Sequence, residues 1–105
     1  MTISINSNLN EGLDAWEVSL SGELDYSQAD ELKKVLHDKV DEKSIDLRVD
    51  LSKLDYIDST GLGVFVGVMK KLKSNDKKVY LLNSKDNVRK IFKISGLDKI
   101  FIMEV

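Results

Sequence analysis

Apolar residues in this chain recur at two spacings that alternate along the sequence, and this alternation constrains the fold more than any other feature. Trp16, Val18 and Leu20 alternate with polar residues, which indicates a half-buried strand. Between residues 27 and 41 apolar residues recur every three or four positions, which indicates a helix. The spacings keep switching and predict the order β-β-α-β-α-β-α-β. Such an order predicts an α/β fold, one domain over residues 1–105, with helices packed on a mixed, mostly parallel sheet.

The boundaries of these elements follow from glycine, serine, asparagine and aspartate, because the chain contains no proline. The expected strands are Thr2–Asn8, Ala15–Ser21, Ile45–Leu51, Val79–Leu82 and Ile100–Val105. The expected helices run from Ser27 to about Asp41, from Thr60 to about Lys73, and from Ser84 to near Gly96, with Ser27, Ser59 and Ser84 as expected caps.

Two loops are candidate sites, because sites in such sheets form at the carboxyl ends of the strands. Residues 21–25, Ser-Gly-Glu-Leu-Asp, are expected to break the second strand. The first candidate loop is therefore Gly22–Tyr26. The second is Asp55–Gly61, which follows the third strand.

Composition and charge exclude several classes of function. The 105 residues carry a formal net charge of −2 with acids and bases mixed, so nucleic-acid binding has no electrostatic support. No apolar run approaches the roughly 20 residues that cross a bilayer, and no signal peptide is visible, which favours the cytoplasm. The absence of cysteine excludes disulfides and thiol catalysis, and the single histidine, His37, excludes a multi-histidine metal site. His37 is expected to be an ordinary surface residue, and no metal or other cofactor is expected.

The start of the second helix, residues 58–63 with the sequence Asp-Ser-Thr-Gly-Leu-Gly, is rich in glycine. A glycine inside a helix costs roughly 1 kcal/mol relative to alanine, yet Gly61, Gly63 and Gly67 fall within the first two turns. Without side chains, Gly61 and Gly63 are expected to leave the helix start uncovered. Another backbone, a nucleotide or a partner surface could then approach it closely.

Ser59 admits two interpretations from these residues alone. In the first it is only an N-cap that accepts a hydrogen bond from the amide of Gly61 or Leu62, and the glycines permit close packing of the helix on the sheet. In the second it is a phosphorylation site. A phosphate carries about −1.5 to −2 charge at pH 7, and the helix start would accommodate it. The fold would tolerate the group, while the outer surface would change strongly.

Other chemical uses of this segment fit less well. A phosphate-binding loop requires Lys-Ser or Lys-Thr after its last glycine, and neither is present. The hydrolase pattern G-x-S-x-G would need a glycine in place of Ile57. A Ser-His-Asp triad would have to use His37 on a solvated helix face. Acids on loops, such as Asp55 and Asp58, form turns more often than metal or acid–base pairs.

Two motifs together resemble one known family. Residues 56–63, Tyr-Ile-Asp-Ser-Thr-Gly-Leu-Gly, resemble the signature of the anti-sigma factor antagonists of the STAS-domain family. Residues 21–25 resemble the second hallmark of that family, the G-x-L-D loop. The order of elements matches over nearly all of the chain. Within the family, residues 58–67 most resemble the antagonists that control a general-stress sigma factor.

The resemblance implies a bacterial, cytoplasmic regulator of transcription that acts by partner switching and is not an enzyme. In this family an anti-sigma factor, which is also a serine kinase, inhibits a sigma factor. The unphosphorylated antagonist binds the kinase and frees the sigma factor. The kinase then phosphorylates the serine that matches Ser59 and the complex dissociates, and a PP2C-type phosphatase removes the phosphate.

The resemblance also implies which residues contact the kinase. The kinase-contacting aspartate of the G-x-L-D loop matches Asp25, for which a turn residue at a helix start is an equally weighted interpretation. Thr60 and Gly61 fall in the same interface. Asp58 and Gly63 are expected to shape the loop and its exposed surface.

Two other classes of function stay open from the sequence. One is a nucleotide-binding module, because glycine-rich helix starts can hold phosphates; it lacks a lysine anchor and a metal-ligand cluster. The other is a structural scaffold of a stress-signalling complex in which Ser59 is never modified. Titration with ATP or GTP tests the first, and mass spectrometry of Ser59 tests the second.

Overall fold

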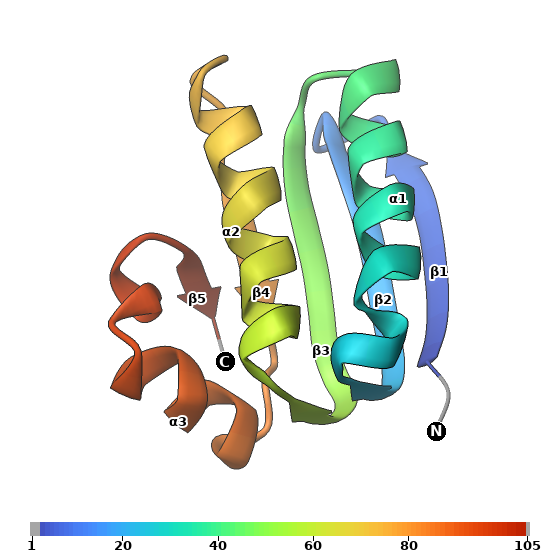
Figure 1. Ribbon diagram of the computed structural model, residues 1–105. Helices are drawn as coiled ribbons and strands as arrows, with labels where there is room; N and C mark the ends of the chain where they lie inside the picture. The colour runs from blue at the N-terminus through green and yellow to red at the C-terminus, as the bar shows by residue number, and fades with distance from the viewer. Residues whose placement is uncertain (1–2, 105) are drawn as a thin grey trace.

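The computed structural model describes residues 3–104 and is built around one five-stranded sheet (Figure 1). The elements in chain order are β1 (Ile3–Asn10), β2 (Ala15–Leu24), α1 (Tyr26–Glu42), β3 (Asp46–Ile57), α2 (Ser59–Lys73), β4 (Val79–Leu82), α3 (Asp86–Ile94), the 3-10 helix η1 (Leu97–Lys99) and β5 (Ile102–Glu104). The predicted α/β class and element order are confirmed, with η1 added between α3 and β5.

The strands lie in the order β1-β2-β3-β4-β5, so neighbours in space are also neighbours in sequence. β1 pairs with β2 in the antiparallel direction, and the remaining pairs are parallel. The parallel pairs place the carboxyl ends of β2, β3 and β4 at one edge of the sheet. The helices that follow these strands begin at this same edge (Figure 1).

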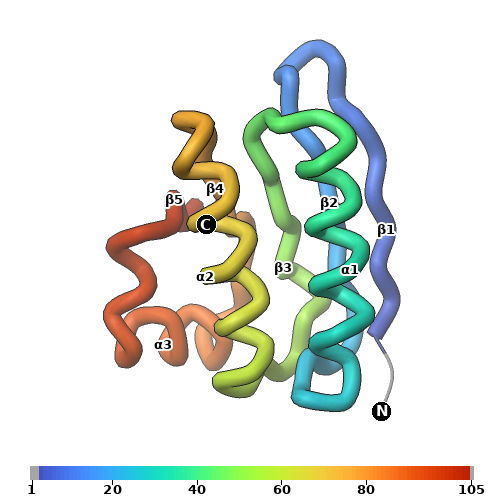
Figure 2. The backbone as a smooth tube through the Cα atoms, turned by 45° about the horizontal axis from the view of Figure 1, so that its top comes forward, coloured from blue at the N-terminus to red at the C-terminus, as the bar shows by residue number. Residues whose placement is uncertain are grey.

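Helices α1 and α2 lie side by side on one face of the sheet (Figures 1 and 2). Leu32 and Leu36 of α1 are fully buried there, as are Phe65 and Leu72 of α2. Helix α3 packs beside them through Phe92, whose ring centroid lies 6.2 Å from that of Phe65. Burial of these large apolar side chains is the main source of stability in the fold.

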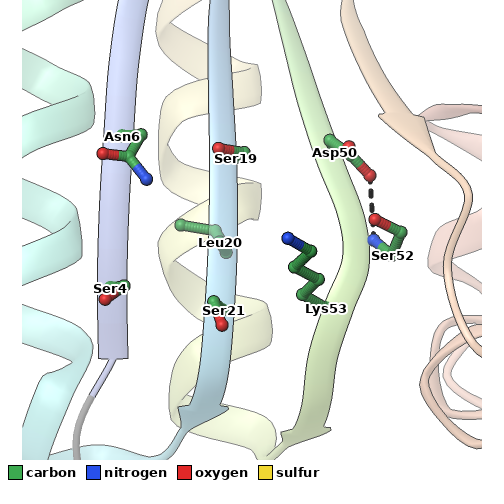
Figure 3. A pocket seen from close by; sticks show the side chains of 8 residues that line it. All are labelled: Ser4, Asn6, Ser19, Leu20, Ser21, Asp50, Ser52 and Lys53. Carbon is green, nitrogen blue, oxygen red and sulfur yellow. Dashed lines mark hydrogen bonds between the residues drawn. The ribbon is translucent and has the colours of Figure 1, made fainter.

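The opposite face of β1, β2 and β3 carries mostly polar side chains, several of them serines (Figure 3). A cavity of about 360 Å³ lies on it, lined among others by Ser4, Asn6, Ser19 and Asp50. An antiparallel edge with one solvated face is expected to alternate in this way. The polar face explains why β1 is only half-buried.

Strands β2 and β3 run further than the sequence predicts. The segment 21–25 does not break β2, which continues to Leu24, and β3 continues six residues beyond Leu51. Two register shifts between β2 and β3 and a positive φ of 112° at Gly22 accommodate the irregular segment. Glycine adopts this φ without strain, so the strand bends there and continues. The two candidate loops therefore shrink to one residue each, Asp25 and Asp58.

The helix caps also differ from the predicted serines. Asp25 caps α1 and Asp58 caps α2, each one or two residues before the serine expected to do so. Lys85 precedes α3 without a side-chain cap, and Ser84 is buried, with its carbonyl accepting from Arg89 Nη2 at 2.6 Å. The sequence correctly indicates a polar residue near each helix start, but for α1 and α2 it does not distinguish the serine from the aspartate one or two residues before it.

The ends of the chain differ in smaller ways. β1 extends two residues past Asn8, and α3 ends at Ile94 rather than near Gly96. Gly96 has a φ of 76° and turns the chain into η1, which shortens the last strand to three residues. Thr2 and Val105 were also expected in strands, and they lie outside the described residues. The β4 bounds are confirmed.

Candidate functional site

The candidate site lies where β2 and β3 end side by side. Leu24 and Ile57, the last residues of the two strands, are register partners. The next residue on β3, Asp58, donates its backbone N–H to the Leu24 carbonyl at 3.1 Å. Pairing to the very end of both strands brings the two predicted loops together, as expected for adjacent parallel strands.

Asp58 forms hydrogen bonds with the starts of both helices. Its Oδ1 accepts from the backbone N–H of Gly61 at 3.0 Å, which is the N-cap interaction of α2. Its Oδ2 accepts from the backbone N–H of Tyr26 at 3.1 Å, the first residue of α1. The side chain is half-buried between them. One carboxylate therefore satisfies amides that both helices leave unpaired at their starts.

Asp25 closes a capping box on α1. Its Oδ1 accepts from the backbone N–H of Ser27 at 2.8 Å and from the Ser27 hydroxyl at 2.6 Å. Gln28 Oε1 in turn accepts from the backbone N–H of Asp25 at 3.2 Å. The hydrogen bonds from Ser27, first that of its hydroxyl and then that of its amide, lower the pKa of the Asp25 carboxyl below its usual value. The structure thus confirms the helix-start role of Asp25, and partner contact by this residue stays a prediction.

Ser59 is exposed and is the first residue of α2, not its cap. The expectation that its oxygen caps the helix is wrong, because Asp58 takes the amide of Gly61. Among residues 3–104, none forms a hydrogen bond with the Ser59 hydroxyl. The next residue, Thr60, is exposed as well. Because the Ser59 hydroxyl is exposed and forms no hydrogen bond within residues 3–104, it is accessible to another protein.

The two glycines near this helix start have different roles. A Cβ on Gly61 would lie 2.8 Å from Leu24 Cγ and 2.9 Å from Ile57 Cγ1, closer than packed carbon atoms tolerate. Gly61 is buried and lets α2 pack tightly on the ends of β2 and β3. A Cβ on Gly63 would meet nothing within 4 Å, and this residue is exposed. The expected uncovered surface is therefore found at Gly63 and not at Gly61.

Two tyrosines at this edge were not singled out from the sequence. Tyr26 at the start of α1 is 77% exposed, and Tyr56 near the end of β3 is 43% exposed. Each lies within three residues of Asp25 or Ser59, and aromatic side chains are enriched at binding surfaces. The alternation pattern does not reveal Tyr56, because the register shifts between β2 and β3 change which residues face outward. Tyr26 is the first residue of α1, where strand alternation does not apply. We define the helix-start surface by the exposed or half-exposed residues at this end of the sheet: Asp25, Tyr26, Tyr56, Ser59, Thr60 and Gly63.

Comparison with known proteins decides the family. The STAS domain family matches residues 6–105, nearly the whole chain. The chain belongs to the STAS domain family. The resemblance indicated by the two sequence motifs is thereby confirmed.

The relatives of this STAS domain include anti-sigma factor antagonists. A Staphylococcus epidermidis protein named anti-sigma-B factor antagonist is 43% identical over 84 residues, covering 80% of this chain and 78% of that protein. The crystal structure of an anti-sigma factor antagonist from Mycobacterium paratuberculosis has a TM-score of 0.87 and 25% identity, covering 98% of this chain and 86% of that one. Bacillus SpoIIAA in its phosphorylated form has a TM-score of 0.75 and 21% identity, covering 97% and 92% respectively, and shares the fold.

The remaining candidate side chains of this STAS domain have structural partners. Asp55 forms an ion pair with Lys85, and its carbonyl accepts from Asn87 Nδ2 at 2.8 Å, which ties the start of α3 to β3. Within residues 3–104, no group of three or more histidine, cysteine or acidic side chains could hold a metal ion. In the same range, no helix is long and apolar enough to span a membrane.

His37 is not the fully solvated residue expected from its neighbours. It is half-buried between α1 and α2, and its Nδ1 lies 3.4 Å from Lys71 Nζ. The pKa of the imidazole is lowered mainly by burial. The charge of Lys71, and to a smaller extent that of Lys33, lowers it further. Asp41 and Asp38 oppose this shift.

Proposed function

We propose that this chain is an anti-sigma factor antagonist whose binding is switched by phosphorylation of Ser59. The unphosphorylated form binds an anti-sigma factor that is also a serine kinase, and the sigma factor held by that kinase is released. The kinase transfers the γ-phosphoryl group of ATP to Ser59 Oγ, which loses its proton, and ADP leaves. The observation that carries the proposal is the exposed Ser59 hydroxyl, which does not cap α2 because Asp58 does.

The position of Ser59 favours a switch that changes the surface and leaves the fold intact. Ser59 is exposed and fills no space in the core. The helix dipole at the start of α2 stabilises added negative charge. Asp58 already occupies the amide of Gly61, so a phosphate would lie beside a carboxylate and not replace it. The result is a strongly negative patch on an otherwise unchanged domain.

Electrostatic repulsion is strong enough to dissociate a complex. A partner carboxylate about 5 Å from the phosphate is repelled by roughly 5 kcal/mol at an effective dielectric of ~20. Salt reduces this by roughly half. Each 1.4 kcal/mol changes the affinity about tenfold, so one phosphate weakens binding by roughly a hundredfold.

The helix-start surface is the proposed docking face for the kinase. Asp25 is half-exposed and Thr60 and Gly63 are exposed, so these three residues contribute directly. Asp58 and Gly61 contribute by holding the two helix starts in place. The exposed ring of Tyr26 adds apolar area of the kind that anchors protein interfaces.

The relatives support this assignment. The Staphylococcus epidermidis relative is an anti-sigma-B factor antagonist, and SpoIIAA is described both in an unphosphorylated and in a phosphorylated form. A PP2C-type phosphatase that removes the phosphate would complete the cycle. Sigma factors act on transcription, so the proposed place of action is the bacterial cytoplasm.

The test is incubation of the chain with the candidate anti-sigma kinase and ATP, followed by mapping of the modified residue. We expect one phosphate, on Ser59. Thr60→Ala tests the site of modification, because it removes the adjacent exposed hydroxyl; even if this docking-face change slows labelling, the phosphate should still map to Ser59. Ser59→Ala should abolish it. Phosphate on Thr60, or undiminished labelling of Ser59→Ala, would contradict the proposal.

A further inference from the structure

A second concave surface lies at the far end of α2 from Ser59. It is a cavity of about 460 Å³ bounded by the C-terminal half of α2, the start of β4 and the η1–β5 segment. Helix α3 lies near the other end of α2 and does not reach this region (Figure 1). The groove is therefore open because the last helix is short and packs near the start of α2.

The rim of this groove is rich in lysine. Lys73 comes from the last turn of α2, Lys77 and Lys78 precede β4, and Lys99 comes from η1. Among the described residues that line the groove, Asp76 is the one acid. No carboxylate within residues 3–104 forms an ion pair with any of these four ammonium groups. We call this surface the lysine groove.

The helix dipole does not account for this concentration of charge. Cations at a helix C-terminus are stabilised by the dipole, which explains Lys73. Lys77 is also at this helix end, since its backbone N–H donates to the Leu72 carbonyl at 3.0 Å. Lys78 and Lys99 lie beyond it, where the dipole has little effect.

Asp76 is in the lining, and Asp46 Oδ1 accepts from the backbone N–H of Lys78 at 2.9 Å, but neither carboxylate forms an ion pair with a lysine of the groove. Four lysines against these acids leave an excess of like charge, which repels itself and lowers the stability of the fold. A cluster of this kind is favoured when a binding partner supplies the missing negative charge.

The floor of the lysine groove is apolar. It is formed by Met69, Val79, Ile100 and Ile102. Met69 and Ile102 are half-buried, and Ile100 remains 44% exposed. An apolar floor within a polar, charged rim is the arrangement found in protein interfaces. A partner that is complementary to this groove therefore has both carboxylates and an apolar side chain.

We propose that the lysine groove docks an acidic segment of a partner protein, with carboxylates on the lysine rim and an apolar side chain over Ile100. A nucleic-acid backbone would pair with the lysines but leave Met69 and Ile100 uncovered. A bilayer surface is flat and would not fill a concave groove. The combination of a positive rim and an apolar floor therefore favours an acidic peptide segment.

This docking does not depend on the state of Ser59. Lys73 is fourteen residues along α2 from Ser59, about 21 Å at 1.5 Å per residue. This exceeds the Debye length of about 8 Å at physiological ionic strength. A phosphate on Ser59 is therefore screened from the lysine groove. The partner held there can remain bound while the helix-start surface changes partners.

A binding experiment with defined peptides tests the proposal. The probe is a 12-residue acetylated peptide of four Glu-Glu-Leu repeats, titrated into the isotopically labelled full chain and followed by NMR. We expect saturable shifts at the amides of Val79 and Ile100, and weaker binding, by about tenfold, when salt is raised from 0.05 to 0.5 M. Peptides of Glu-Glu-Ser and Lys-Lys-Leu repeats should bind at least tenfold more weakly. Equal binding of all three, or shifts spread over all lysines, would overturn the proposal.

Charge reversal provides a second, independent readout. The double variant K78E/K99E should weaken binding of the Glu-Glu-Leu peptide at least tenfold. The matched control K53E/K90E changes the net charge equally at exposed lysines outside the groove and should leave binding within twofold. Circular dichroism and the thermal midpoint verify that both variants fold. Equal loss of affinity in the two variants would overturn the assignment to this groove.

Two further experiments measure the binding of other ligands to the groove and the effect of a charge at Ser59 on peptide binding. Single-stranded DNA and vesicles containing anionic phosphatidylserine are tested under the same conditions, and tighter binding of either at the groove would contradict a peptide site. The peptide should bind Ser59→Asp as tightly as the unmodified chain. A Ser59→Asp affinity that falls tenfold would contradict the independence of the two surfaces.

Discussion

The carboxylate of Asp58 accepts a hydrogen bond from the backbone amide of Tyr26 at 3.1 Å, across 32 residues of sequence. Its other oxygen accepts from Gly61 at 3.0 Å within its own helix start. The first turns of α1 and α2 are therefore held together by one side chain. This link holds the start of α2, which carries the exposed Ser59, beside the start of α1, which carries Asp25 and Tyr26.

Removing this carboxylate should destabilise the fold. Asp58→Ala leaves two helix-start amides without their acceptor, and we expect the free energy of unfolding to fall by about 1–2 kcal/mol. Asp58→Asn retains one acceptor and should lose about half as much. Urea titration measures both. Asp38→Ala, an exposed position in the middle of α1, is the control and should change stability by less than about 0.5 kcal/mol.

The two glycines should respond in opposite directions to the same substitution. Gly61→Ala introduces a Cβ that overlaps Leu24 and Ile57, and it should destabilise the fold by about 1–3 kcal/mol. Gly63→Ala meets open space and should stabilise α2 by up to about 1 kcal/mol, because alanine has the higher helix propensity.

The same pair separates stability from binding. If Gly63 lies in the docking face, Gly63→Ala should weaken kinase binding although the fold gains stability. Equal thermal midpoints for Gly61→Ala and Gly63→Ala would contradict the tight contact described at Gly61.

The stability of the fold should depend on pH near neutrality through His37. Its folded-state pKa lies below the ordinary value of 6.5, so the unfolded chain binds the proton more strongly. Stability is therefore full above pH 6.5 and falls as the pH decreases from 6.5 through the lowered folded-state pKa. His37→Gln should remove this part of the pH dependence.

NMR titration of the only imidazole in the chain measures this pKa directly. A folded-state value at or above 6.5 would show that Asp41 and Asp38 outweigh burial and the neighbouring lysines. Stability would then be unchanged or would rise on acidification.

Most of the architecture can be predicted from the sequence, because apolar spacing reports which face of an element is buried. The order of elements and the bounds of β4 follow from that pattern. The extension of β2 to Leu24 does not, since a bulged segment with Gly22 interrupts the alternation while backbone pairing continues. Strand pairing depends on residues that are far apart in the sequence, so the spacing of apolar residues within one segment does not predict where pairing ends.

The position of the candidate site can be predicted from the sequence, but the roles of its individual residues cannot. The motifs locate Asp25, Asp58 and Ser59 at neighbouring strand ends, and the structure brings the two strand ends together. The choice of Asp58 over Ser59 as the cap depends on which side chain reaches the amide of Gly61. The role of Gly61 depends on a contact with Leu24, which lies 37 residues earlier in the chain, and short-range patterns do not contain this information.

Two substitutions of Ser59 should distinguish the effect of negative charge on kinase binding from the effect of a changed side-chain shape. Ser59→Ala removes one oxygen and should bind the anti-sigma kinase within about threefold of the unmodified chain. Ser59→Asp adds one negative charge, about half that of a phosphate, and should weaken binding by roughly tenfold. Isothermal titration calorimetry with each purified variant gives both values. Similar affinities for the two variants would show that charge at this position does not control docking.

The most direct measurement compares the kinase affinity of the chain before and after stoichiometric phosphorylation of Ser59. Circular dichroism should show the same fold in both forms, and the affinity of the phosphorylated form should be lower by roughly a hundredfold. Equal affinities of the two forms for the kinase would contradict the central claim that a phosphate at the start of α2 repels the partner without unfolding the domain.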